Sequence, residues 1–143
     1  MRPLALVPAL LLGACASSHP VPDFINPVGA PARPFSQAVR ANGMLYLAGQ
    51  LGTDSTGKLA AGGIQPQTRQ ALENIRAVLL RAGSSMDKVV KCTVFLADMK
   101  EWAAMNEVYV TFFDPARRPA RSAFGTTGLA LDGRVEIECI AAE

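Results

Sequence analysis

From residue 34 onward, hydrophobic and polar residues follow two different periods, and these periods predict the secondary structure. Apolar side chains recur every three or four positions over residues 64–82, which is typical of an amphipathic helix that ends at Gly83. The same spacing over residues 102–113 predicts a second helix, which ends before Pro115 and whose aromatic stripe should lie in the core.

Shorter apolar stretches predict the strands of a sheet. Strands are expected at residues 35–40, 44–48, 89–96, 121–126 and 134–141. The first two flank Asn42-Gly43, a strong signal for a hairpin turn. Together with the helices, the order is ββαβαββ, which predicts an α+β domain with one mixed sheet and both helices packed on one face.

The second face of this sheet also needs to be covered. Residues 44–48 are apolar at every position, so both faces of that strand should be buried. Two helices on one side would leave the other side bare. We therefore expect other copies of the chain to bury the second face.

The N-terminus has the features of an export signal. In residues 1–14, Arg2 precedes an apolar run, Leu4 to Leu12, that is too short to span a bilayer. The sequence Leu12-Gly13-Ala14-Cys15 resembles the lipobox of bacterial lipoproteins, in which the signal is cut before a lipidated cysteine. This predicts lipidation at Cys15 and a location on the bacterial cell envelope, facing the periplasm, with the membrane contacted only through the lipid. The alternative is a cytosolic protein whose N-terminus is not a functional signal.

The following segment is rich in proline and serine. Residues 15–33 should form an extended tether because such a composition cannot bury a core. Residues 34–143 then form the folded domain. With 50% hydrophobic and 18% charged residues, the composition is ordinary for a globular protein.

Charge and residue usage exclude several classes of function. The net charge is +2 and the basic residues are scattered, so no nucleic-acid partner is expected. The one histidine, His19, lies in the Pro/Ser-rich stretch, which argues against a histidine-dependent nucleophile. The cysteines lack metal-ligand spacing, so no metal site is expected. We expect Cys92 and Cys139 to be buried free thiols on strands; a disulfide is the alternative in an oxidising envelope.

Two charged residues near the C-terminus are candidates for chemistry. Arg121 lies in an otherwise apolar or small stretch and offers a planar fork of donors that matches a carboxylate. By strand alternation, Glu136 and Glu138 share one face, away from the helices, where a carboxylate can activate water. The patterning leaves two readings open: a pocket for a substrate carboxylate, or an Arg–Glu salt bridge that stabilises an oligomer.

Several motifs together resemble the reactive intermediate deaminase A (RidA, YjgF-like) family. They are Met44 to Gln50 with its Ala48-Gly49-Gln50 end, Gln70-Ala71-Leu72-Glu73-Asn74, Asn106, Pro119-Ala120-Arg121-Ser122 and the stretch from Val135 to Ala141. The resemblance covers about residues 34–142. It implies a homotrimer of the chorismate-mutase-like kind, with pockets at the subunit interfaces. It also implies hydrolysis of 2-aminoacrylate-type imines to 2-keto acids and ammonia, without a cofactor.

The resemblance also assigns roles to particular residues. Arg121 would bind the carboxylate of the small imino-acid substrate, Glu136 would position the attacking water, and Gly49 would line the pocket with its backbone. Phe35 and Ala123 occupy substrate-binding positions where the family usually has tyrosine and cysteine, and Ala48 replaces a frequent serine. The pocket should therefore be more apolar than is usual. The alternative function is a non-catalytic envelope protein that binds small carboxylates at trimer interfaces.

Overall fold

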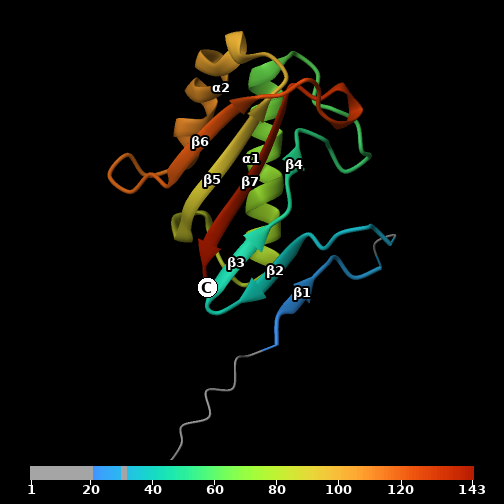
Figure 1. Cartoon of the computed structure of the whole chain (residues 1–143), viewed down its shortest axis with the longest axis vertical. Coiled ribbons are helices and arrows are strands. Elements are labelled where there is room, and N and C mark those ends of the chain that lie inside the picture. Colours follow the sequence, from blue (N-terminus) through green and yellow to red (C-terminus); the bar gives the residue numbers. More distant parts are fainter. Residues whose placement is uncertain (1–20, 30–31) are drawn as a thin grey trace, which may run out of the picture.

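The computed structural model describes residues 21–29 and 32–143 as one sheet backed by helices (Figure 1). The strands are β1 (Asp23–Ile25), β2 (Ala38–Ala41), β3 (Met44–Leu47), β4 (Gln50–Leu51), β5 (Val89–Leu96), β6 (Ala120–Gly125) and β7 (Val135–Ala142). The helices are α1 (Ile64–Arg81) and α2 (Trp102–Tyr109), with short 3-10 turns at η1 (Met86–Lys88), η2 (Met99–Glu101), η3 (Val110–Phe112) and η4 (Ala130–Asp132).

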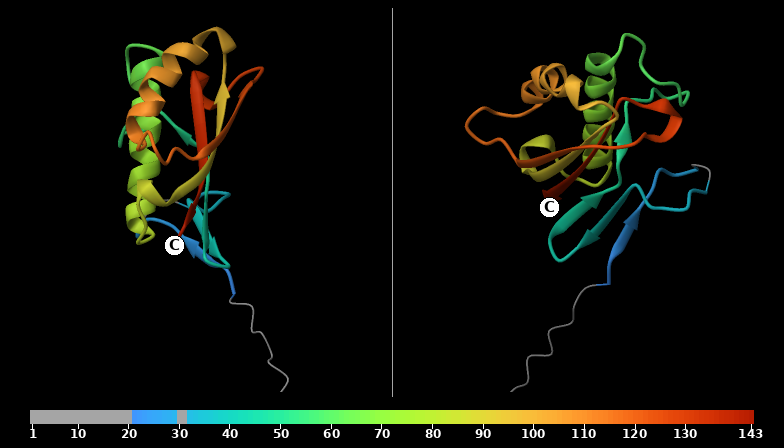
Figure 2. Two further views of the ribbon diagram at one scale, coloured as in Figure 1. Left: turned by 90° about the vertical axis from the view of Figure 1, so that its left-hand side faces the viewer. Right: turned by 45° about the horizontal axis from the view of Figure 1, so that its top comes forward.

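The sheet is mixed, as predicted. Its strands lie in the order β1-β2-β3-β7-β5-β6, and β4 pairs with β7. The β5–β6 pair is parallel, whereas the other pairs are antiparallel. Seen edge-on, both helices lie on the same side of the sheet (Figure 2). The α+β class and the placement of the helices are therefore confirmed.

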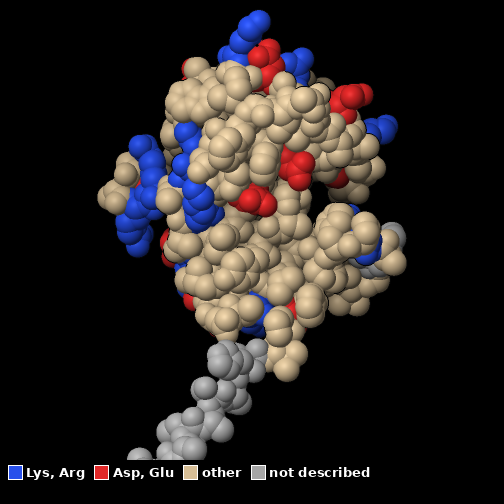
Figure 3. All heavy atoms as spheres, in the orientation of Figure 1, with Lys and Arg blue, Asp and Glu red and all other residues tan. Residues whose placement is uncertain are grey.

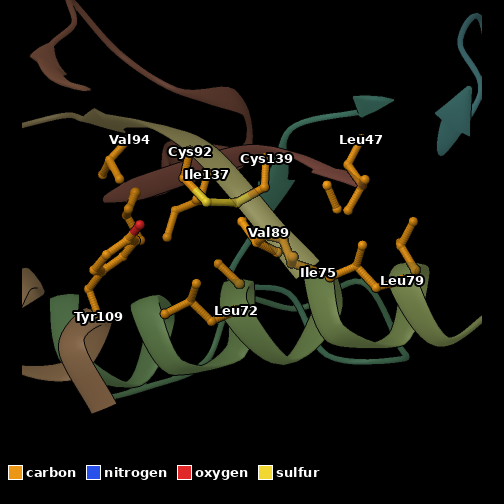
Figure 4. Packing of buried hydrophobic residues seen from close by; sticks show 14 of the residues in the cluster. Leu47, Leu72, Ile75, Leu79, Val89, Cys92, Val94, Tyr109, Ile137 and Cys139 are labelled. Carbon is orange, nitrogen blue, oxygen red and sulfur yellow. A yellow bond between two sulfur atoms is a disulfide. The ribbon is translucent and has the colours of Figure 1, made fainter. Parts of the chain in front are cut away.

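The hydrophobic core lies between α1 and the central strands (Figure 4). On β7, every second side chain is buried, among them Val135 and Ile137, while the residues between them are more exposed. Leu72 and Ile75 of α1 pack against these strands and are fully buried. Each such side chain contributes about 1.5–3 kcal/mol through burial, so the alternating pattern determines which face of the sheet meets the helix.

A disulfide joins the two central strands, which corrects the expectation of free thiols. Cys92 on β5 and Cys139 on β7 lie directly opposite each other in the antiparallel register. Their Cα atoms are 4.1 Å apart and their sulfur atoms are bonded. The spacing of the cysteines in the sequence carries no information on this register, which only the pairing of β5 with β7 establishes.

The N-terminal segment differs from the predicted tether. The strand β1 lies inside residues 15–33 and pairs with β2, with Phe24 opposite Val39, so the expectation of an extended tether is wrong for this part. Backbone pairing at a sheet edge needs little side-chain burial: Phe24 is 65% exposed. The predicted signal segment and Cys15 lie outside the described residues. No helix in the described part of the chain is long and apolar enough to cross a membrane.

Two element boundaries differ from the prediction by more than one residue. The first predicted strand begins at Ala38 and not at Phe35. The second helix is α-helical only to Tyr109 and continues as the 3-10 turn η3. The predicted hairpin is confirmed: Asn42 and Gly43 both have positive φ, 51° and 74°, as a two-residue turn with the twist of the strands requires.

One face of the sheet is not covered within a single chain. On β3, Leu45 and Leu47 are buried, but Tyr46 points to the other face and is 46% exposed, so the chain alone does not bury both faces. Phe124 of β6 is also exposed on this face, opposite Phe95 in the register. Figure 3 shows this side: it is mostly uncharged, with carboxylates near its middle and basic residues gathered along one side. We call it the open sheet face.

Candidate active site

Arg121 lies on β6, the edge strand, and its side chain points toward α2. It is level with Cys92 in the parallel register, on the side of the sheet that carries the helices. Its Nη1 donates a hydrogen bond of 2.7 Å to Oδ1 of Asn106. The guanidinium carbon also lies 4.7 Å from the ring centre of Tyr109 and 5.6 Å from that of Trp102. Arg121 forms no ion pair among the described residues, which leaves its charge available to an anion.

Glu136 lies on β7 and points to the open sheet face, between the buried residues Val135 and Ile137. Its carboxylate lies against the backbone at Gly49, where a Cβ atom would be only 2.0 Å from Oε1. A glycine is therefore required at residue 49 for this position of the carboxylate. Burial raises the pKa of Glu136, and the negative charge of Glu138 raises it further. The chain thus places a half-buried, proton-accepting group beside the partly buried backbone of Gly49.

One chain does not bring Arg121 and Glu136 together. Their strands lie on either side of β5, with Arg121 level with Cys92 and Glu136 opposite Phe95. Cys92 faces the helices, whereas Phe95 faces the open side, because side chains alternate along a strand. The two charged groups therefore lie on opposite faces of one sheet. A pocket that contains both must combine residues of two copies of the chain.

The other predicted site residues lie in two different places, Ala123 beside Arg121 on β6 and Phe35 before β2. Ala123 shares the strand face of Arg121 and packs partly buried against the core. Phe35 lies before β2 and is 51% exposed; with Phe24 and Pro34 it lines a cavity of about 500 Å³. The guanidinium of Arg33 lies 6.0 Å from the ring centre of Phe35. An aromatic ring and a cation thus line the wall of an open cavity at this end of the sheet.

The residues of α2 that contact Arg121 are not apparent from the sequence pattern. Trp102 and Tyr109 were assigned to a core stripe, yet Trp102 is 39% exposed and lies beside the guanidinium. Asn106 was noted in the family resemblance but was given no role. Burial raises the pKa of Tyr109 to about 12, although the charge of Arg121 acts in the opposite direction. The spacing of residues 102, 106 and 109 puts all three on one helix face, and the asparagine in an aromatic stripe is the signal that could have revealed them.

Comparisons with known proteins identify the family of the chain. The family whose sequence model matches residues 27–143 is described as Endoribonuclease L-PSP. A RutC family protein of Pyrococcus horikoshii is 47% identical over 112 residues, which cover 78% of this chain and 88% of that protein. A Mus musculus protein named 2-iminobutanoate/2-iminopropanoate deaminase is 43% identical over 122 residues, covering 83% of this chain and 90% of that protein.

A solved structure shows the same fold. The crystal structure of YyfA from Yersinia pestis, a member of the conserved Rid protein family, superposes with a TM-score of 0.79 at 40% identity. The match covers 86% of this chain and 100% of the YyfA chain. Because the family match spans most of the chain and the relatives share both sequence and fold with it, this protein belongs to the Endoribonuclease L-PSP family, the group of the RidA, Rid and RutC proteins.

Proposed function

We propose that this protein is an enamine/imine deaminase that hydrolyses 2-aminoacrylate-type imines to 2-keto acids and ammonia. The observation that carries the proposal is the state of Arg121, whose guanidinium is oriented by neutral residues and has no acidic partner among the described residues. Such a group is suited to hold a substrate carboxylate in a bidentate manner. The name of the Mus musculus relative points to the same class of substrate.

Glu136 supplies the second group that the reaction needs, a base that activates water. The substrate carboxylate binds to Arg121, and the carboxylate of Glu136 accepts a proton from a water molecule whose oxygen attacks the imine carbon. The proton passes from Glu136 to the imine nitrogen, which gives a carbinolamine. Glu136 then takes the proton of the carbinolamine hydroxyl and delivers it to the amino nitrogen, so that the C=O bond forms as the C–N bond breaks, and ammonia leaves the 2-keto acid. Water is the only co-reactant, so none of these residues has to hold a cofactor.

We propose that the assembly is a homotrimer, as the family resemblance implies, with the site between subunits. Two observations support it: the open sheet face carries exposed aromatic residues such as Tyr46 and Phe124, and Arg121 and Glu136 of one chain lie on opposite faces. Burying the open face against a second copy removes apolar area from water. It also allows Arg121 of one subunit to meet Glu136 of the next.

The residues around the charged pair favour larger substrates. Phe35 has no hydroxyl to offer, and Ala48 and Ala123 are small and apolar. Each missing side-chain hydrogen bond costs about 1 kcal/mol of interaction with a small polar substrate. We therefore propose that imino acids with bulkier apolar side chains are preferred over 2-aminoacrylate.

We further propose that the protein is attached to the cell envelope through a lipid on Cys15. The disulfide between Cys92 and Cys139 supports an oxidising compartment, because such bonds rarely persist in the cytosol. Labelled fatty acid should appear on the wild type and be absent from Cys15→Ser. An unlabelled protein in the cytosolic fraction contradicts the anchor and supports the alternative, a cytosolic location.

A direct assay tests the deaminase. An amino-acid oxidase generates imines, and their disappearance is followed with wild type, Arg121→Ala and Glu136→Gln. Wild type should accelerate the loss, and both variants should return it to the rate in buffer. If wild type never exceeds buffer, the enzyme proposal is wrong, and carboxylate binding that depends on Arg121 would then support the alternative, a non-catalytic carboxylate binder.

The description of the matching family names an endoribonuclease, an activity that the described residues do not favour. The one histidine of the chain, His19, lies outside the described residues, so the described fold offers no imidazole for acid–base cleavage of RNA. Incubation of the protein with RNA in the same assay series checks this point. Cleavage that is lost in Arg121→Ala would contradict our choice.

A further inference from the structure

The residues that hold Arg121 form a cradle on one face of α2, made of Trp102, Asn106 and Tyr109. Asn106 accepts one hydrogen bond from Nη1, and the two aromatic rings lie 5.6 Å and 4.7 Å from the guanidinium carbon. Arginine has five N–H donors, and Asn106 occupies one of them. Donors therefore remain for a carboxylate ligand, while the two nearby rings restrain the guanidinium.

The cradle differs from the surroundings of Arg76 in having no charge. Arg76 also lies over an aromatic ring, that of Phe112 at 5.0 Å, but it is neutralised by an ion pair with Glu73. At Arg121 the corresponding polar partner is an amide, and Tyr109 is uncharged at neutral pH, with its pKa raised by burial to about 12. The fold thus orients the arginine without neutralising it.

We propose that Trp102, Asn106 and Tyr109 are positioning residues whose lack of charge keeps Arg121 able to bind a substrate carboxylate. The inference rests on the proposed function in taking Arg121 as the anchor of the carboxylate. A purely structural role, in which these contacts only attach α2 to β6, predicts a different response to an added charge.

The substitution Asn106→Asp separates the two roles. Aspartate keeps the size and the acceptor oxygen of asparagine, so the contact between α2 and β6 is retained and strengthened by charge. The added carboxylate also competes for the guanidinium and repels the substrate. At a separation of several ångströms this should weaken carboxylate binding by about tenfold or more.

The experiment measures three quantities for each variant: kcat and KM for imine hydrolysis, the affinity for 2-oxobutanoate as a stable carboxylate probe, and the thermal unfolding midpoint. Asn106→Asp should raise KM and weaken the probe about tenfold, while kcat stays within about threefold and the midpoint does not fall. Trp102→Leu should raise KM several-fold. Phe112→Leu, the matched control, removes an arginine–aromatic contact of the same kind and should lower the midpoint without changing KM.

The outcomes distinguish this inference from the proposed function. If wild type hydrolyses imines and Asn106→Asp keeps the wild-type KM and probe affinity, the deaminase stands and the inference is wrong. If wild type binds 2-oxobutanoate through Arg121 and Asn106→Asp weakens that binding, but no imine is hydrolysed, the inference stands and the deaminase is wrong. If no binding depends on Arg121, both fail. Should Asn106→Asp not fold, the KM of Trp102→Leu decides.

Discussion

The substitution Gly49→Ala tests whether the position of the Glu136 carboxylate matters for the reaction. The added Cβ would lie 2.0 Å from Oε1 of Glu136 and 2.9 Å from its carboxyl carbon, whereas ordinary contacts begin at 3.4 Å. The carboxylate must therefore move by about 1.4 Å, and a displacement of this size costs about a hundredfold in rate. The backbone does not resist the change, because Gly49 is not among the glycines with positive φ.

Stability should be nearly unaffected, which makes this variant informative. The atoms that clash belong to the end of a flexible side chain, and moving them costs about 1 kcal/mol. Gly52→Ala is the contrasting control: its Cβ would lie 2.4 Å from the backbone oxygen of Gln67 in α1, which cannot move away. That variant should lose about 1–3 kcal/mol of unfolding free energy.

The assay combines imine hydrolysis with denaturant unfolding for Gly49→Ala, Glu136→Gln and the double variant. If the alanine acts by displacing the carboxylate, Gly49→Ala should reduce kcat/KM about a hundredfold but cause no further loss in the Glu136→Gln background. Wild-type activity in Gly49→Ala would refute the reasoning. So would losses that add in the double variant, because the glycine would then act independently of Glu136.

Four further predictions concern Glu136 and pH, the disulfide and the open sheet face. Since burial and then Glu138 raise the pKa of Glu136, the acid limb of kcat/KM should lie above the range of an ordinary glutamate, and Glu138→Gln should move it to lower pH. The raised pKa also means that the fold favours the protonated form of Glu136. This contribution to stability is present below the pKa of the unfolded chain and is lost as pH rises through the pKa of the folded chain. Glu136→Gln should therefore unfold at a higher denaturant concentration than wild type near neutral pH, and an unchanged midpoint would contradict the burial of the carboxylate. Replacing Cys92 and Cys139 by alanine opens a link across 47 residues and should lower the free energy of unfolding by about 4 kcal/mol in denaturant titrations, while no change would argue against the bond. Tyr46→Glu should shift the molecular mass in sedimentation from trimer toward monomer, and an unchanged trimer would place the interface elsewhere.

The sequence determined the parts of this protein that depend on local periodicity. The bounds of the helix α1 and the strand β5 were predicted within one residue. A long stretch of regularly spaced or continuous apolar residues is compatible with few other secondary structures. Glu136 was correctly placed on the face away from the helices, since buried residues flank it on β7. The motif residues also identified the family. Short strands such as β1 and β4 were missed because two or three residues carry no period.

Only the tertiary structure decided how these strands lie beside one another. The opposition of Cys92 and Cys139 depends on the β5–β7 register, and two cysteines far apart in a sequence cannot reveal it. The face on which Arg121 lies follows from the parallel pairing of β6 with β5, since the small residues of β6 do not alternate. Arg121 is thereby separated from Glu136 within one chain and placed in the neutral cradle of α2. Periodicity gives the direction of a side chain relative to its own strand, and strand pairing gives its neighbours.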